Sequence, residues 1–325
     1  MGRNLFYIDI QRTLIYNKRM KKLWTEQYRP NTLNGYVFRD QTQKEQIQGW
    51  VQSGSIPHLL FSGAPGTGKT TLAKILFNEL KIDAYDILEI NASRENSIDT
   101  IRDKITNFVQ TMPFGDLKVV LLDEADYISP NGQAALRGVM EEYHTTARFV
   151  LTCNYPNRVI PALHSRCQGF HIERLDQTEF TARVAEILVS EKIEIEIDTI
   201  DTYVKATYPD LRKCINMVQM NSQTGKLVSP DKADTGTQDY KLDMVTLFKA
   251  GKISEARKLL CTQARPEEME DIYRWMYDNI ELFAKDEEGQ DKAVLIIKQG
   301  LVDHSFVADP EINLSATLIK LGRLQ

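Results

Sequence analysis

Residues 63 to 70 read Gly-Ala-Pro-Gly-Thr-Gly-Lys-Thr, a complete G-x-x-x-x-G-K-T loop between an apolar run at 59–61 and a helix-like stretch at 72–76. Glycines let backbone N–H groups turn inward around a phosphate, and the following helix points its positive end at the anion. Lys69 adds a mobile positive charge, and Thr70 offers a hydroxyl to Mg²⁺. The loop predicts a nucleoside triphosphate site, whose contacts come from Gly63, Ala64, Pro65, Gly66, Thr67, Gly68, Lys69, Thr70 and Thr71.

Acidic residues end the apolar run at 118–122, in the order Asp-Glu-Ala-Asp over 123–126. A P-loop protein that hydrolyses nucleotides needs acids in this position for its metal ion. We expect Asp123 to hold Mg²⁺ through its water shell and Glu124 to polarise the attacking water as a general base. A purely structural acid is the alternative, and the complete phosphate loop argues against it.

Three further polar residues are candidates for the same site because they occur together with the phosphate loop and the acids. Asn154 ends the apolar run at 148–152, where its amide can hydrogen-bond a γ-phosphate or the lytic water. Arg166 precedes the last short apolar run, and Arg212 lies at the start of a helical stretch. Taken singly, such an asparagine is usually a turn former and such arginines are usually salt-bridge partners.

Strand-like and helix-like segments must position these residues. Strands are expected at 59–61, 87–90, 118–122, 148–152 and 169–172, and helices at 72–76, 97–110 and 132–143. This alternation predicts the α/β class, with a parallel sheet covered by helices on both faces. After residue 175 helical periodicity takes over, at 180–192, 197–206 and 211–220.

The pattern divides the chain into five segments. A basic N-terminal arm is either a disordered tail or a phosphate-binding one. An α/β nucleotide-binding domain, a small helical domain, a polar linker and an all-helical domain follow it. The expected bounds are 1–22, 23–175, 176–222, 223–240 and 241–325.

Composition narrows the class of protein. The chain has 325 residues, a net charge of -5 and no long apolar stretch or secretory signal, which predicts a cytoplasmic protein without a membrane partner. Its four cysteines form no C-x-x-C pair, so neither a zinc knuckle nor a redox pair is expected. The mild negative charge still permits a local basic groove for nucleic acid.

The motifs together resemble the ATPase subunits of sliding-clamp loaders, the replication factor C small-subunit type of the AAA+ superfamily. The resemblance runs from Trp24 to Met220 and implies an AAA+ domain, a helical lid over 176–222 and a helical oligomerisation collar over 241–325. The short chain and divergent collar resemble the phage branch, which implies a phage-infected bacterial cell and several copies joined to one different subunit. The segments that match in order and spacing are Glu26-Gln27-Tyr28-Arg29-Pro30, Gly63 to Thr70, Asp123 to Asp126, Thr152-Cys153-Asn154 and Ser165-Arg166-Cys167.

The resemblance also implies roles for single residues. Asn154 would be the first sensor of the nucleotide, and Arg212 the second sensor, which reports to the lid. Arg166 looks like an arginine finger that acts on the ATP of the adjacent subunit. Because such a finger accelerates hydrolysis about 10³–10⁵-fold, turnover would depend on assembly. The residues that would flank the adenine are Tyr28, Arg29 and Pro30.

Contacts to DNA and to the clamp are implied in the same way. Arg94 and Arg102 belong to a stretch similar to the family's DNA-facing segment and would contact phosphates without reading bases. Arg137, in a Gln-x-Ala-Leu-Arg-x-x-Met-Glu pattern, would link DNA to the ATP site. Met112 and Phe114 are candidate clamp contacts. The plainer alternatives are solvated charges for the arginines and packing under a loop for the apolar pair.

These expectations combine into one leading function. The chain would hydrolyse ATP to ADP and phosphate when DNA and clamp stimulate it, and would place a ring-shaped polymerase clamp on primer–template DNA. One alternative is a branch-migration or helicase-type DNA motor, although residues after 175 lack a second RecA-like domain. The other is a non-hydrolysing ATP-binding scaffold, against which Lys69, Glu124 and Arg166 all argue.

Overall fold

The computed structural model describes residues 22–95, 98–172, 174–228, 240–264, 268–304 and 306–324. The chain divides into two compact units. The first comprises the residues up to Ile187 together with Pro209–Asn216, and the second comprises Leu188–Tyr208 together with the residues from Met217 onward. Apart from Lys22, the expected basic arm lies outside the described residues, as does most of the expected linker. The division into five segments therefore stays a prediction.

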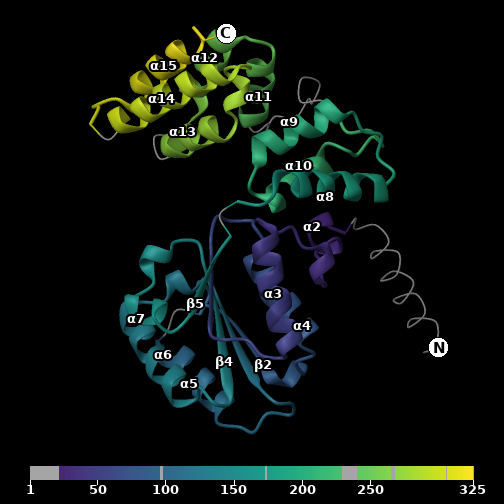
Figure 1. Ribbon diagram of the computed structural model, residues 1–325, viewed down its shortest axis with the longest axis vertical. Helices are drawn as coiled ribbons and strands as arrows, with labels where there is room; N and C mark the ends of the chain where they lie inside the picture. The colour runs from purple at the N-terminus through teal and green to yellow at the C-terminus, as the bar shows by residue number, and fades with distance from the viewer. Residues whose placement is uncertain are drawn as a thin grey trace, which may run out of the picture. The chain divides into compact units, whose positions relative to one another are not determined.

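Five parallel strands form one sheet in the first unit, in the order β2-β3-β4-β1-β5 (Figure 1). The apolar side chains of β3 and β4 are buried, as in strands that are covered on both faces. The α/β class with a parallel sheet is thus confirmed. The strands are β1 (Leu59–Ser62), β2 (Ile87–Asn91), β3 (Lys118–Asp123), β4 (Ala147–Cys153) and β5 (Gln168–His171).

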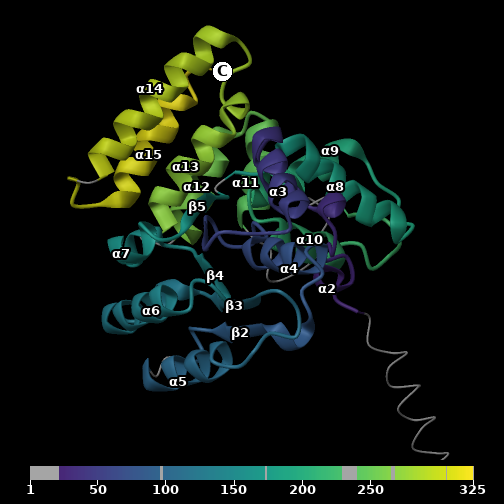
Figure 2. The ribbon, with the colours of Figure 1, turned by 60° about the horizontal axis from the view of Figure 1, so that its bottom comes forward.

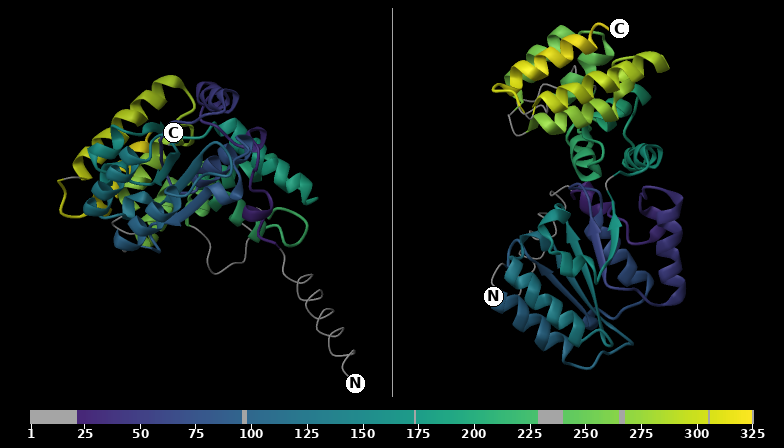
Figure 3. Two further views of the ribbon diagram at one scale, coloured as in Figure 1. Left: turned by 90° about the horizontal axis from the view of Figure 1, so that it is seen from below. Right: turned by 60° about the vertical axis from the view of Figure 1, so that its left-hand side comes forward.

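Helices cover both faces of this sheet. Helices α5, α6 and α7 lie on one face, and α3 and α4 lie on the other, an arrangement that Figures 2 and 3 repeat from other directions. The helices of this unit are α2 (Trp24–Gln27), α3 (Gln41–Ser53), α4 (Lys69–Glu79), α5 (Ile98–Val109), α6 (Pro130–Glu142), α7 (Pro161–His164) and α8 (Gln177–Ser190), the last residues of α8 belonging to the second unit. Short 3₁₀ helices are η1 (Leu33–Gly35), η2 (Ala84–Asp86), η3 (Ala125–Tyr127) and η4 (Pro156–Arg158).

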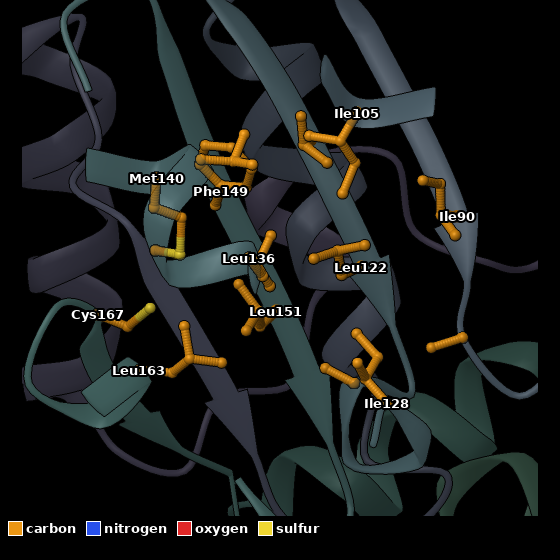
Figure 4. Packing of buried hydrophobic residues seen from close by; sticks show 14 of the residues in the cluster. Ile90, Ile105, Leu122, Ile128, Leu136, Met140, Phe149, Leu151, Leu163 and Cys167 are labelled. Carbon is orange, nitrogen blue, oxygen red and sulfur yellow. The ribbon is translucent and has the colours of Figure 1, made fainter. Parts of the chain in front are cut away.

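One hydrophobic core cluster of the first unit lies between the sheet and helices α5 to α7 (Figure 4). Phe149 and Leu151 of β4 face Leu136 and Met140 of α6 there, and all four are buried. Full burial of such side chains stabilises a fold by about 1.5–3 kcal/mol each. The apolar face of α6 therefore holds that helix, with its exposed Arg137, firmly against the sheet.

Capping residues account for several differences between expected and observed bounds. Helix α6 begins before the expected residue 132, because the Ser129 side chain accepts a hydrogen bond from Gly132 N (3.3 Å) and Pro130 occupies the first turn. Helix α8 ends at Ser190 instead of residue 192, since Lys192 has a φ of 58° and cannot continue it. Ser97, the expected first residue of α5, lies outside the described residues.

The described residues of the second unit form helices, as expected, joined by turns and one isolated bridge between Glu194 and Lys226. Phe248, Tyr273 and Phe283 lie in its core. Helices α14 and α15 pack closely at Gly300, where a Cβ atom would lie 2.4 Å from Thr317 Oγ1. No helix in the described part of the chain is both long and apolar enough to span a membrane. The elements are α9 (Ile197–Thr207), α11 (Tyr240–Lys249), α12 (Ile253–Gln263), α13 (Met269–Asp278), η7 (Ile280–Leu282), α14 (Glu287–His304) and α15 (Pro310–Leu321), while α10 (Leu211–Met220) has residues in both units.

Candidate functional site

The predicted chemical residues meet at the carboxyl ends of three neighbouring strands. The phosphate loop follows β1, Asp123 ends β3, and Asn154 follows β4, which lies between the other two. Lys69 begins helix α4 directly after the loop. In open parallel sheets, ligands bind in the crevice outside the carboxyl ends of the strands, where the strand order reverses. The topology therefore brings the loop, the acids and the asparagine to one edge.

The phosphate loop has the backbone that its glycines permit. Gly66 and Gly68 have φ angles of 73° and 91°, in the left-handed region that favours glycine. The Lys69 ammonium is buried and donates hydrogen bonds to Gly63 O (2.8 Å) and Ala64 O (2.7 Å). Burial lowers the pKa of Lys69 to about 8, although the nearby Asp123 acts in the opposite direction. The loop thus surrounds a cation that can lose its charge at mildly alkaline pH.

This pKa predicts a pH dependence of ATP affinity. Phosphate oxygens favour the charged ammonium, so bound ATP raises the pKa of Lys69 above its value of about 8 in the free protein. Between the two pKa values binding takes up a proton, and the dissociation constant should rise up to about tenfold per pH unit. Titration of ATP binding between about pH 7 and 9.5 measures this slope.

Lys69→Ala is the control for that titration. We expect its affinity to be about 100-fold lower at neutral pH, since a hydrogen bond to a charged group contributes about 1.5–3 kcal/mol. Its dissociation constant should then change little with pH across the same range. A flat profile for the unaltered chain would contradict the assignment of the titrating group.

Two threonines tie the loop and the acids together. Asp123 Oδ1 accepts hydrogen bonds from the hydroxyls of Thr70 (2.6 Å) and Thr152 (2.6 Å). The Thr152 hydroxyl accepts in turn from Glu124 N (3.1 Å). Glu124 has a φ of 58°, an uncommon conformation for a residue with a side chain. Strained backbone of this kind clusters at functional sites.

Thr152 has a role that sequence reasoning did not predict. In the sequence it stands out only as part of a matching triplet. Its signal is a hydroxyl directly after the apolar run Phe149-Val150-Leu151, near the end of that strand. The structure places this hydroxyl between the two acids, where it fixes the backbone of the proposed base.

A cavity in the first unit joins the phosphate loop to the segment before β1. Tyr28, Arg29 and Pro30 line it, as expected of residues that flank a base. So does Arg212, with Thr71 beside the loop. The lining residues are Thr25, Tyr28, Arg29, Pro30, Gly35, Tyr36, Val37, Gly66, Thr67, Gly68, Thr71, Leu175, Arg183, Leu211, Arg212 and Ile215.

Tyr36 and Arg183 support this cavity and were not predicted either. Tyr36 is buried, and its hydroxyl donates to Thr67 O (3.3 Å). A Cβ atom at Gly68 would lie 2.9 Å from the Tyr36 ring, so the ring requires a glycine there. Burial raises the pKa of Tyr36 above its usual value. Arg183 donates to Tyr28 O (2.8 Å) and so holds the backbone of the base-flanking segment.

Arg212 reaches the site from the start of α10. Asp210 accepts a hydrogen bond from Lys213 N (2.8 Å) and so caps this helix. The Asp210 carboxylate also lies against Gly66. A Cβ atom at residue 66 would be 1.8 Å from Asp210 Oδ1, so only a glycine fits at this position. Burial raises the pKa of Asp210. The cap therefore sets the start of α10, with its exposed Arg212, beside the phosphate loop.

Arg166 is directed elsewhere. Its guanidinium pairs with Glu141 and donates to Ala162 O (2.8 Å), both on the side of the sheet that carries α6 and α7. Glu141 Oε1 also lies 4.0 Å from Arg137 Nε. Within the described residues, none of the polar contacts of Arg166 is with the phosphate loop of its own chain.

The candidate DNA and clamp residues do not lie at the ATP site either. Arg94 follows β2, Arg102 is on α5 and Arg137 is on α6, and all three are exposed. Met112 and Phe114 lie in the loop before β3 and are 86% and 78% exposed. Both side chains are therefore exposed and not packed under the loop.

Comparison with known proteins identifies the family of the chain. Residues 59–174 match the model of the family described as "ATPase family associated with various cellular activities (AAA)". The "Replication factor C small subunit" of Methanococcus vannielii is 36% identical and aligns over 94% of this chain and 100% of its own length. The protein of the same description from Archaeoglobus fulgidus is 35% identical, over 93% and 98%. The chain belongs to the replication factor C small-subunit family.

Membership in this family makes the protein an AAA ATPase that binds and hydrolyses ATP. The alignment to full-length small subunits extends beyond the AAA match into the helical C-terminal part. The expected phage placement, and with it a phage-infected cell, is not borne out, because the relatives named above are archaeal.

Solved structures agree with the fold. The Thermotoga maritima RuvB Holliday junction branch migration motor superposes with a TM-score of 0.53 over 68% of this chain and 79% of its own. A second structure of Thermotoga maritima RuvB gives 0.52 over the same shares. Each is 17% identical, so this likeness shows the AAA+ fold alone.

Proposed function

We propose that the protein is an ATPase subunit of a sliding-clamp loader, which opens a ring-shaped polymerase clamp and places it on primer–template DNA. The observation that carries this proposal is the alignment of nearly the whole chain with replication factor C small subunits, together with the complete ATP site in this sequence. Several copies of the chain and one different subunit would form the loader. ATP binding stabilises the assembly on the clamp, and hydrolysis releases it. Its place of action is the cytoplasm.

ATP would occupy the cavity and the adjoining phosphate loop. Tyr28, Arg29 and Pro30 would flank the adenine, and the loop's N–H groups and Lys69 would donate hydrogen bonds to the phosphates. Arg212, at the cavity, reports the nucleotide to the helical lid.

Mg²⁺ fits the donor set at the end of β3. The Thr70 hydroxyl and the Asp123 carboxylate converge within 2.6 Å, and hard oxygen ligands of this kind suit Mg²⁺. Among the described residues no three His, Cys, Asp or Glu side chains form a metal cluster, which agrees with an ion held by one carboxylate, a hydroxyl and phosphates. When bound, the ion neutralises charge on the β- and γ-phosphates.

Hydrolysis would use residues from two chains. Glu124 accepts a proton from the attacking water, and the Asn154 amide orients that water or the γ-phosphate. Arg166 supplies positive charge to the site of the neighbouring subunit. Its contacts with Glu141 and Ala162, away from its own phosphate loop, support a role in trans.

DNA would bind through phosphate contacts. Arg94 follows β2, Arg102 lies on α5 and Arg137 lies on α6, and all three are exposed. Contacts to phosphates position a protein on DNA without reading its sequence. Glu141 contacts both Arg137 and Arg166, so DNA that binds Arg137 would affect the position of Arg166.

The clamp would bind an apolar patch made of Tyr85, Met112 and Phe114, where Tyr85 adds a residue that was not predicted. The rings of Tyr85 and Phe114 lie 5.5 Å apart, and Tyr85 is 76% exposed. Buried Asp86 accepts hydrogen bonds from Phe114 N (3.0 Å) and Gly115 N (2.7 Å), with Lys118 Nζ 3.7 Å from it. A buried ion pair thus holds exposed apolar side chains in a fixed loop, as a docking surface requires.

Phe114→Asp should weaken clamp binding about 30-fold, since an apolar anchor at an interface contributes about 2 kcal/mol or more. ATPase activity without clamp should stay unchanged. Phe306→Asp is the matched control, because this phenylalanine is 85% exposed in the second unit and should leave clamp affinity unaltered. Equal affinities of the two variants in a pull-down titration would exclude the patch.

A direct test of the function measures ATPase activity with and without primed DNA and a candidate clamp, together with the mass of the assembly. A loader gives stimulation by both and a defined oligomer. A branch-migration or helicase-type motor would separate strands or move junctions instead. The likeness to the RuvB fold is the reason to test for this activity. A scaffold shows ATP binding without turnover.

A further inference from the structure

The last acid of the Asp-Glu-Ala-Asp segment, Asp126, holds the backbone of Asn154. Its Oδ2 atom accepts hydrogen bonds from Asn154 N (3.3 Å) and Tyr155 N (3.1 Å). These consecutive N–H groups follow the end of β4, where the chain turns into η4. Two N–H groups on one carboxylate oxygen fix the turn, and with it the direction in which the Asn154 side chain leaves the backbone.

The same segments are joined a second time. Glu124 N donates a hydrogen bond to the Thr152 hydroxyl at 3.1 Å. Glu124 lies two residues before Asp126 at the end of β3, and Thr152 lies two residues before Asn154 at the end of β4. The segment that carries the base and the segment that carries the sensor are therefore bridged at both ends. The distance between Glu124 and Asn154 depends on these bridges.

The cost of burying Asp126 indicates a functional purpose. The residue is only 6% exposed, and its Oδ1 has no hydrogen-bond partner among the described residues. A buried polar atom without a partner is unfavourable, and a role at a catalytic site is one of the reasons for which native proteins keep such atoms.

We propose that Asp126 is a positioning residue for ATP hydrolysis, which acts by aiming the Asn154 side chain and does not touch the substrate. The inference rests on the proposed sensor role of Asn154. Asp126 contributes an acceptor oxygen at a defined distance from the turn. The length of its side chain therefore matters for this role, and its charge does not.

Two conservative substitutions separate shape from charge. Asp126→Asn keeps an acceptor oxygen at the same reach and removes the charge, whereas Asp126→Glu keeps the charge and moves the oxygens outward by one methylene. In the loader assembled from the full-length chain and its companion subunit, D126N should keep kcat within about threefold. D126E should lose about 10–100-fold in kcat, as expected when a catalytic group is displaced by about 1 Å. The KM for ATP should change by less than about threefold in both.

A double-mutant cycle tests whether the effect passes through Asn154. N154A should lose as much kcat as D126E, and D126E/N154A should lose no more than N154A alone. Asp309 gives the matched control, because its Oδ1 accepts from Glu311 N (2.9 Å) and Ile312 N (3.2 Å) at the start of α15. D309E should leave kcat unchanged, and thermal melting of every variant confirms folding.

Each result decides between the possibilities. An impaired D126N with an active D126E would mean that charge matters, and would overturn the proposal. Additive losses in the double mutant would overturn it as well, since Asp126 would then act apart from Asn154. Full activity of N154A would remove the sensor role itself, whereas an impaired N154A beside an active D126E would remove only the inference about Asp126.

Discussion

Replacing Arg166 by alanine is expected to lower DNA-stimulated kcat for ATP about 10³-fold or more while leaving ATP affinity unchanged. The reason is geometric. Arg166 pairs with Glu141 on its own chain and makes no polar contact with its own phosphate loop within the described residues. Its charge is available to a neighbouring chain that meets this face. Single-turnover hydrolysis by the assembled loader measures the expected loss of rate. A separate nucleotide-binding measurement checks that the affinity for ATP is unchanged.

A mixing experiment distinguishes action in trans from action in cis. Chains with Lys69→Ala keep the finger and lose the loop, while chains with Arg166→Ala keep the loop and lose the finger. If the site is shared, mixed assemblies recover part of the activity that neither variant has alone. Arg158→Ala is the control for loss of an arginine, because Arg158 is exposed and stacks on Tyr155 at 4.5 Å. No recovery in the mixture would contradict a shared site.

The phosphate-binding half of the site could be predicted because its chemistry is local in the sequence. The loop, the base and the strand-end asparagine each sit within a few residues of the strand that positions them. Parallel strands bring their carboxyl ends to the same edge, so the order of the motifs was sufficient to expect one site. The structure adds that β4 lies between β1 and β3, which no local pattern specifies.

Residues that act through long-range contacts could not be predicted. Tyr36 packs on Gly68 and bonds Thr67, which is 31 positions away in the chain, and nothing in its own neighbourhood indicates this. Asp210 is separated still further from Gly66 in the chain. Such contacts follow from tertiary packing, which local propensity and spacing do not encode.

Arg166 illustrates the opposite case. Its motif is recognisable in the sequence, yet no local pattern indicates its partner within the chain. The pairing with Glu141, which Arg137 approaches at 4.0 Å, emerges only because α6 and α7 pack side by side. An exposed ion pair of this kind contributes only about 0–1 kcal/mol, so a neighbouring site with a bound triphosphate can compete for the arginine. The ion pair with Glu141 therefore orients Arg166 and still allows it to move to a neighbouring site.

The second large effect concerns Glu124. Glu124→Gln removes the proton acceptor and keeps the size of the side chain, so we expect kcat to fall about 10²–10⁴-fold, the usual contribution of a general base. ATP binding should persist, because Lys69 and the loop N–H groups are untouched. The variant should consequently hold the clamp on ATP and fail to release it, which a filter-binding assay for retained clamp would detect.

The strained backbone at Glu124 makes the choice of substitution important. Its φ of 58° is supported by the bond from Glu124 N to Thr152 Oγ1, and glutamine keeps both. Glu124→Gly would relieve the strain and free the backbone, so its loss of activity would mix two causes. Thr152→Val separates them: it keeps the Glu124 carboxylate and removes only the hydroxyl that holds the Glu124 backbone and binds Asp123 Oδ1, so it should cost less than Glu124→Gln. Retained clamp release by Glu124→Gln would show that another group takes the proton from water, and the base would then have to be sought elsewhere at this edge of the sheet.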